Sequence, residues 1–213
     1  YINKPLEKRI NKKFVKKAES ALEDRKDLIK IGITGSYGKT SVKEILKSFL
    51  SMKYEVLSTP ESYNTPLGIS KTVNNLDDND KIFIAEMGAR RQGDIKELTK
   101  MVKPDIAVIT GVTAQHLETF KTLKAIESTK YELIANMPAG GKAYFSSDND
   151  ITAKMYEKCP YSKVLAGMGD KMRGSVYAEN VEISLSGSKF TLVINGEKVD
   201  IETRLLGAHN VSN

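Results

Sequence analysis

The sequence predicts an α/β fold in which a P-loop-type, mostly parallel sheet is flanked by helices and is followed by a small antiparallel β-subdomain near the C-terminus. Two observations support this prediction. From residue 30 onward, short β-branched runs alternate with helical periodicity, which implies right-handed βαβ units and a parallel sheet covered on both faces. After Arg173 the helical segments stop, and three strand-like runs follow with Ser-Gly and Asn-Gly at their turns.

The first 30 residues predict a basic amphipathic helix or linker. Ten Lys and Arg residues and five Asp and Glu residues give this segment +5 of the chain's net charge of +6. A stripe with a four-residue spacing supplies one apolar face, formed by Leu6, Ile10, Phe14, Ala18 and Leu22. A patch for anionic lipid or nucleic acid is one interpretation. A solvated helix docked on the domain is favoured, because charge runs alone are weak signals. We therefore expect no nucleic-acid partner, and membrane contact by residues 1–30 is the disfavoured alternative.

The next 140 or so residues, 31–170, are expected to form the α/β core. Its buried strands are predicted at residues 30–34, 81–87, 104–110 and 141–147, and its helices at residues 40–53, 93–103 and 122–137. The antiparallel β-subdomain is expected at residues 171–206, with strands at 175–187, 188–196 and 197–207, and a further helix is expected to start within residues 207–213.

Composition narrows the class of protein. The 213 residues are 40% apolar and contain no run near the ~18 apolar residues of a membrane span. Cys159 is the single cysteine, which excludes an internal disulfide framework and favours a reducing, cytoplasmic compartment. Tyr1 is neither an initiator Met nor part of an apolar signal segment, so we expect that it is not the natural start.

A glycine-rich loop between the first strand and the first core helix predicts a nucleotide site. Free N–H groups at a helix N-terminus favour an anion, Lys39 offers a charge for β- and γ-phosphate oxygens, and Thr40 offers a hydroxyl for Mg²⁺. The usual first glycine of this motif is replaced by Ile33. A tight turn with an incidental lysine is the disfavoured alternative. The loop runs through Thr34, Gly35, Ser36, Tyr37, Gly38, Lys39, Thr40 and Ser41.

Two further candidate residues follow predicted strands, at the edge where ligands of parallel sheets gather. Glu86 ends the run at residues 81–87 and could hold Mg²⁺, or it could be a surface or capping residue. His116 follows the run at residues 104–110 and is either a ligand or a structural histidine.

Five separated segments resemble the Mur ligase family, whose members are ATP-dependent amide-forming enzymes of peptidoglycan synthesis. The resemblance covers about residues 31–213, and several segments take the form typical of the member that adds D-Ala-D-Ala. These segments are TGSYGKTSVKE (34–44), AEMGARRQGDIKELTKMVKPDIAVIT (85–110), AQHLETF (114–120), TKYE (129–132) and GAHNVSN (207–213).

The resemblance implies two Mg²⁺ ions, the first held by Thr40 and Glu86 and the second by His116 and Lys130. Lys130 matches the lysine that the family carbamylates with CO₂. Carbamylation turns a cation that repels Mg²⁺ into an anion with two hard oxygens.

The same resemblance implies contacts with ATP and with the other substrate. Lys39 would hold the β- and γ-phosphates within the loop at residues 34–41, and three residues of the last segment would lie on the adenine side: His209, Asn210 and Asn213. The segment TPESYNTPLGI (59–69) is similar to the substrate loop. It contributes Asn64 and Thr65 where the family often has Asn-Asn.

The implied function is a carboxylate–amine ligase that uses ATP to add D-Ala-D-Ala to UDP-MurNAc-tripeptide through an acyl phosphate. Residues 31–213 would be the central ATPase domain, with the N-terminal UDP-binding and C-terminal ligase domains absent, so we expect an inactive, monomeric fragment. Three alternatives remain: another amide ligase of the superfamily, such as a folylpolyglutamate synthase-like enzyme; a P-loop kinase or NTPase; and a non-catalytic nucleotide-binding module.

Overall fold

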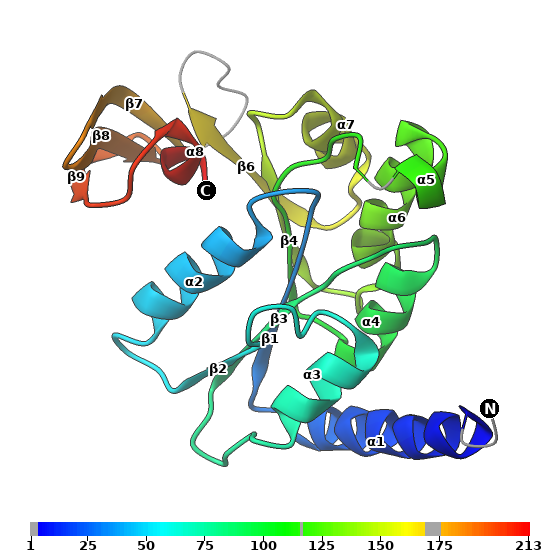
Figure 1. The fold of residues 1–213 in the computed structure, drawn as a ribbon. Coiled ribbons are helices and arrows are strands. Elements are labelled where there is room, and N and C mark those ends of the chain that lie inside the picture. The colour runs from blue at the N-terminus through cyan, green and yellow to red at the C-terminus, as the bar shows by residue number, and fades with distance from the viewer. Residues whose placement is uncertain (1–3, 116, 169–175) are drawn as a thin grey trace.

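The computed structural model describes residues 4–115, 117–168 and 176–213, and they build one sheet flanked by helices (Figure 1). The strand order is β2-β3-β1-β4-β5-β6-β7-β8-β9; strands β1 to β7 are paired in parallel, and β8 and β9 are antiparallel. The strands are β1 (Ile29–Thr34), β2 (Val56–Ser58), β3 (Ile82–Glu86), β4 (Ile106–Ile109), β5 (Lys142–Ser146), β6 (Ser162–Met168), β7 (Val176–Ser184), β8 (Gly187–Ile194) and β9 (Glu197–Thr203).

The helices cover both faces of the parallel part of the sheet (Figure 1). On one face lies α2, and on the other lie α1, α3, α4, α6 and α7. The helices are α1 (Lys4–Asp24), α2 (Lys39–Leu50), α3 (Pro66–Val73), α4 (Asp94–Val102), α5 (Leu117–Phe120), α6 (Leu123–Asn136), α7 (Asp150–Lys158) and α8 (Ala208–Ser212). Within the described ranges, no helix is both long enough and apolar enough to cross a membrane.

Alternation along the central strands divides the core into two layers. In β3, Ile82 and Ile84 pack with Val42 of α2, whereas Phe83 and Ala85 pack in the cluster under the opposite helices. Every residue of β3 is buried because both faces of this strand are covered. The central strands are therefore rigid supports for the loops at their carboxyl ends.

The amphipathic helix α1 is docked along only part of its predicted stripe. Ala18 and Leu22 are buried in the core cluster, where α1 meets α3 and α4. Ile10 and Phe14 of the same stripe are 48% and 44% exposed. The C-terminal half of α1 is therefore packed against the domain.

The predicted core strands correspond to β1, β3, β4 and β5, and the predicted core helices correspond to α2, α4 and α6. Five elements were not predicted: β2, α3, α5, α7 and β6. The strand β2 has only three residues, and β6 carries a lysine and a glycine in place of a continuous β-branched run. Their strand character depends on pairing with neighbours rather than on local propensity.

The C-terminal strands are antiparallel to one another, as predicted, with Asn195 and Gly196 at positive φ in the tight turn between β8 and β9. The boundary expected at residue 171 does not separate two sheets, however. Parallel pairing of Ala166 in β6 with Val176 in β7 makes the C-terminal strands a continuation of the main sheet.

Candidate functional site

The loop between β1 and α2 is fastened to the segment that follows β4. The backbone N–H of Ser36 donates to the carbonyl of Gly111 at 2.6 Å. The Ser36 hydroxyl donates to the carbonyl of Thr113 at 3.1 Å and accepts from the Thr113 N–H at 3.1 Å. These bonds hold the loop at the carboxyl edge of the sheet, so its shape is set before any ligand arrives.

The last glycine of the loop is required by both conformation and space. Gly38 precedes the first turn of α2 with φ 78°, in the left-handed region that favours glycine. A Cβ at this position would lie 2.7 Å from Oδ1 of Asn213. A side chain at position 38 would therefore have to displace the side chain of Asn213.

Glu86 is the centre of a polar cluster at the carboxyl end of β3. Its Oε2 accepts from the hydroxyl of Thr40 at 3.0 Å, and its Oε1 lies at 3.5 Å from Nδ2 of Asn64, which donates to it. Its backbone N–H donates to the hydroxyl of Thr59 at 3.0 Å. The structure thus brings together Glu86, Thr40 and Asn64, which the sequence analysis selected from three separate segments.

Two predicted site lysines have pKa values shifted by burial. Burial lowers the pKa of Lys39, an effect that the charge of Glu86 opposes, and Nζ of Lys39 donates to the Ser36 carbonyl at 3.4 Å. The pKa of Lys130 falls to about 8, mainly because it is buried and also because of the charge on Lys39; Asp94 and Glu132 oppose this shift. More of the Lys130 amine is therefore neutral near pH 7 than for an ordinary lysine.

A cavity of about 790 Å³ joins these groups at the carboxyl edge. Its wall includes Lys39 from α2, Asn64 and Thr65 from the segment before α3, and Lys130 from α6. The hydroxyl of Thr65 accepts from the N–H of Gly68 at 3.3 Å, so this side chain caps α3. Residues from three segments far apart in the sequence thus surround one space.

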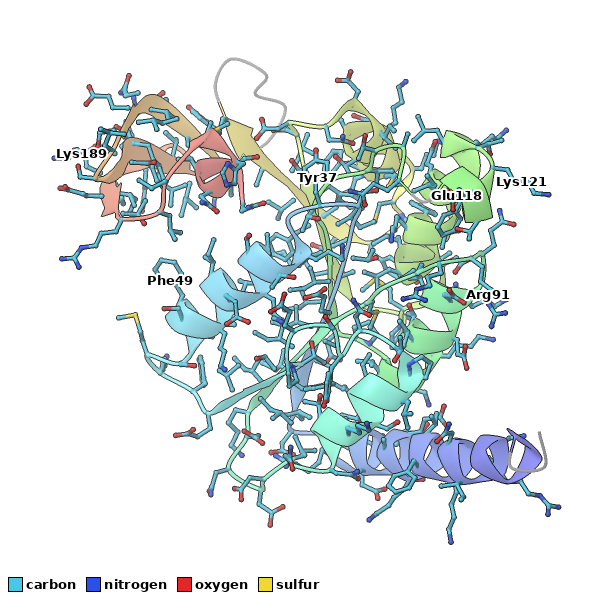
Figure 2. All side chains as sticks on the ribbon, viewed as in Figure 1. Tyr37, Phe49, Arg91, Glu118, Lys121 and Lys189 are labelled. Atoms are coloured by element: carbon cyan, nitrogen blue, oxygen red, sulfur yellow. The ribbon has the colours of Figure 1, made fainter. Side chains whose placement is uncertain are left out.

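A second groove, of about 650 Å³, lies on the α2 face of the sheet and is mostly apolar. Five of the predicted ATP-binding residues line it: Tyr37, Gly38, Ser41, His209 and Asn213. Figure 2 shows Tyr37 at the loop end of α2. Asn210, by contrast, does not line either cavity, and its Nδ2 donates to the carbonyl of Leu206 at 2.8 Å.

Three residues of this region were missed by the sequence analysis. Lys43 is buried beside Glu86, and Thr59 fixes the Glu86 backbone. Glu132 accepts from the N–H groups of Gly93 and Lys96 at 2.8 and 2.9 Å, which caps α4. The available sequence signal for these residues was that they lie in the segments 34–44, 59–69 and 129–132, which the sequence analysis had already selected. The predicted ligand His116 lies outside the described residues.

The donors near Lys39 fit a magnesium ion held together with phosphate. The Thr40 hydroxyl and the Glu86 carboxylate offer hard oxygens at one point. In the described ranges there is no group of three or more His, Cys, Asp and Glu residues that could hold a metal alone. Mg²⁺ usually takes only one or two protein carboxylates and completes its shell with water and phosphate, so this sparse set fits it.

Comparison with known proteins places this geometry in a family. Residues 33–213 match the Mur ligase middle domain. The chain is 33% identical over 197 residues to the UDP-N-acetylmuramoyl-tripeptide--D-alanyl-D-alanine ligase of Buchnera aphidicola subsp. Baizongia pistaciae, covering 92% of this chain and 43% of the relative.

Solved structures agree with the sequence comparison. MurF from Acinetobacter baumannii superimposes with a TM-score of 0.87 at 27% identity, covering 95% of this chain and 44% of that protein. MurF ligase from Thermotoga maritima in complex with ADP gives 0.81 at 28% identity, covering 90% and 44%. The chain thus spans less than half the length of these relatives. From its middle-domain match and its fold, this chain belongs to the Mur ligase family.

Proposed function

We propose that this chain is the nucleotide-binding middle domain of an ATP-dependent ligase that adds D-Ala-D-Ala to UDP-MurNAc-tripeptide. The observation that carries the proposal is the gathering of Lys39, Lys130 and the Thr40–Glu86 pair around one edge of the sheet. The name of the Buchnera relative supports the choice of substrates. Because the relatives are more than twice as long, the complete reaction is proposed for the longer protein, and nucleotide binding for this chain.

In this proposal, the triphosphate and the nucleoside of ATP occupy different cavities. The triphosphate lies on the loop at residues 34–41, with its γ-phosphate toward Lys39 and the 790 Å³ cavity. The nucleoside lies in the second groove, beside His209 and Asn213. Asn210 belongs to the same helix, and contact with adenine would require its side chain to leave the Leu206 carbonyl. The ADP in the Thermotoga relative is consistent with a nucleotide site in this domain.

The proposed reaction activates the C-terminal carboxylate of the tripeptide. Its oxygen attacks the γ-phosphorus, so a P–O bond forms to the carboxylate and the P–O bond to ADP breaks. The amine nitrogen of D-Ala-D-Ala then attacks the carbonyl carbon, the C–O bond to phosphate breaks, and the nitrogen loses a proton. Asn64 and Thr65 border the cavity in which we place the tripeptide carboxylate. Positioning and charge neutralisation are the main contributions of the protein.

The residues present could hold two Mg²⁺ ions, whose chemistry is to neutralise charge between triphosphate and carboxylate. Thr40 and Glu86 would hold the first, and His116 and Lys130 the second. Lys130 would serve as a carbamate, in which its neutral amine has formed an N–C bond to CO₂ and released a proton. With a pKa of about 8, roughly a tenth of this amine is neutral at pH 7, far more than for an ordinary lysine.

We place the ATPase domain at residues 31–213 and treat residues 1–30 as a docked helix and connector. The UDP-binding and amine-binding functions are assigned to other parts of the longer protein, and isolated residues 1–213 are expected to form no amide. We propose a cytoplasmic, monomeric enzyme; nucleotide-linked substrates and the single, buried Cys159 are consistent with a reducing compartment.

Calorimetric titration of this chain with ATP and saturating Mg²⁺ tests the nucleotide site. Lys39→Ala is expected to weaken binding about 10- to 100-fold, because a charge-assisted contact to phosphate is lost. Lys47→Ala is the matched control, since Lys47 lies exposed on the same helix and lines neither cavity. Equal affinities for the Lys39 variant and the wild type, with unchanged circular dichroism, would contradict the proposal.

A further inference from the structure

Lys43 is a buried cation that the proposed reaction does not use. It lies in α2, one helical turn after Lys39, and its side chain is completely buried. Its Nζ lies 3.4 Å from Oε2 of Glu86 and 3.4 Å from Oε1 of Glu44, yet no acceptor in the described structure has hydrogen-bond geometry toward it. Burying an ammonium group is costly, so a charge retained here needs a compensating partner.

The relevant partner is Glu86 rather than Glu44. The Glu86 side chain is 5% exposed and that of Glu44 is 57% exposed, so water screens the second pair and not the first. Oε2 of Glu86 is also the oxygen that accepts from the hydroxyl of Thr40. Lys43 and Thr40 therefore both approach one carboxylate oxygen, from successive turns of one helix.

In the metal-free domain, the negative charge of Glu86 lies close to the place where the nucleotide phosphates are proposed to bind. A buried carboxylate beside the phosphate loop repels a nucleotide polyanion, and the repulsion is strong where water is excluded. Lys39 has to attract phosphate and cannot also neutralise Glu86 completely. Lys43 can do so, because it is enclosed behind the carboxylate and lines neither of the two cavities.

We propose that Lys43 is a positioning residue that neutralises and orients Glu86 in the metal-free domain, so that nucleotide phosphates can occupy the loop before Mg²⁺ is bound. This inference rests on the proposed nucleotide function. When Mg²⁺ is present, it supplies the positive charge beside Glu86, and the contribution of Lys43 to nucleotide affinity becomes smaller. The signature of this role is therefore an effect that depends on the metal.

The test is calorimetric titration of this chain with ADP, once in EDTA and once in saturating Mg²⁺. Lys43→Met keeps most of the length of the side chain and removes its charge. We expect its ADP affinity to fall at least tenfold in EDTA and less than threefold in Mg²⁺. Lys47→Met, on the exposed side of the same helix, is the control and should match the wild type in both buffers.

A double variant separates neutralisation from a general effect on packing, and it remains informative if Lys43→Met alone fails to fold. In Lys43→Met/Glu86→Gln both members of the buried pair are neutral, so we expect ADP affinity in EDTA within about threefold of the wild type. Its gain from Mg²⁺ should be largely lost, because the carboxylate is gone.

Three results would overturn the inference. Equal losses with and without Mg²⁺ in Lys43→Met would mean that Lys43 supports the fold only, and would leave the proposed function intact. A double variant as weak as Lys43→Met in EDTA would have the same meaning. A wild-type chain that binds ADP in neither buffer would overturn the proposed function together with this inference.

Discussion

One sheet contains both the parallel strands around β1 and β3 and the C-terminal strands β7 to β9. The two regions differ in whether their charged side chains are buried or exposed to water. Around β3, helices cover both faces, and Lys43, Glu86 and Lys130 are buried at or near the strand ends. In the C-terminal strands, Lys198 pairs with Glu179 and Lys189 pairs with Glu202 at the surface. Figure 2 shows Lys189 at the outer edge, far from Tyr37 and the loop.

The difference shows why the candidate site lies where it does. Water screens the surface pairs and makes their net contribution small. In the covered part of the sheet, burial lowers the pKa of Lys130, and the hydroxyl of Thr40 holds the carboxylate of Glu86 in place. The carboxyl edge of the covered strands therefore holds buried charges in fixed positions, whereas we expect strands β7 to β9 to tolerate substitutions at their exposed charged residues.

The largest expected difference between the two regions is in stability. Phe83→Ala should lower the free energy of unfolding by about 3–5 kcal/mol, because a fully buried ring is removed from the two-sided core. Val199→Ala in β9, where the side chain is 51% exposed, should cost less than about 1 kcal/mol. Urea unfolding followed by circular dichroism measures both. Similar losses would mean that the two regions are packed alike.

The next comparison concerns lysine function in the longer protein. Lys130→Ala should lower the rate of amide formation by on the order of 10²–10³-fold, because the carbamate that we propose on this lysine could no longer neutralise charge beside the transferred phosphoryl group. Lys189→Ala on the exposed β8 should keep the wild-type rate. Acetate or bicarbonate should partly restore Lys130→Ala by occupying the vacated space. A wild-type rate in Lys130→Ala would mean that this lysine does not take part in the reaction.

Burial of Lys130 also predicts a dependence of stability on pH. Its pKa is about 8 in the folded chain against 10.5 for an ordinary lysine, so the unfolded chain binds more protons between these values. The penalty for burying the charge is complete below pH 8, and the free energy of unfolding rises as pH increases from about 8 to 10.5, by on the order of 3 kcal/mol.

This rise is isolated by comparison with a variant, since other groups titrate in the same range. Lys130→Met should lack it, so the stability difference between the variant and the wild type should change with pH. Lys124→Met, at an exposed position of the same helix, should follow the wild type at every pH. Parallel curves for wild type and Lys130→Met in urea unfolding would contradict the lowered pKa.

The smallest expected loss of stability comes from replacing either of two glycines that have positive φ. Gly196 has φ 91° and open space around it, so Gly196→Ala should cost about 1–2 kcal/mol from backbone strain alone. Gly38→Ala should add the displacement of Asn213 to a similar strain and also weaken ATP binding. Unfolding and calorimetry on both variants make the comparison. Equal ATP affinities would mean that the loop tolerates a side chain at position 38.

Much of the parallel core could be predicted from the chain itself. Short runs rich in apolar residues predicted β1, β3, β4 and β5, because strands of a sheet covered by helices on both faces are mostly apolar. The loop at residues 34–41 was visible because its glycines and Lys39 are adjacent in the sequence. Glu86 was found because it ends an apolar strand.

The remaining features depend on contacts between distant residues. The parallel pairing of β7 with β6, the burial of Lys43 and the capping of α4 by Glu132 have no local pattern. Thr40 and Glu86 form a hydrogen bond although they are 46 residues apart in the sequence. Lys39 and Lys130 line one cavity although they are 91 residues apart. Composition and periodicity determined which segments become buried strands and which loop can hold phosphate, because those depend on neighbouring residues. Only the tertiary structure decided which lysines are buried beside a carboxylate, because burial and pKa depend on what the fold packs around each charge.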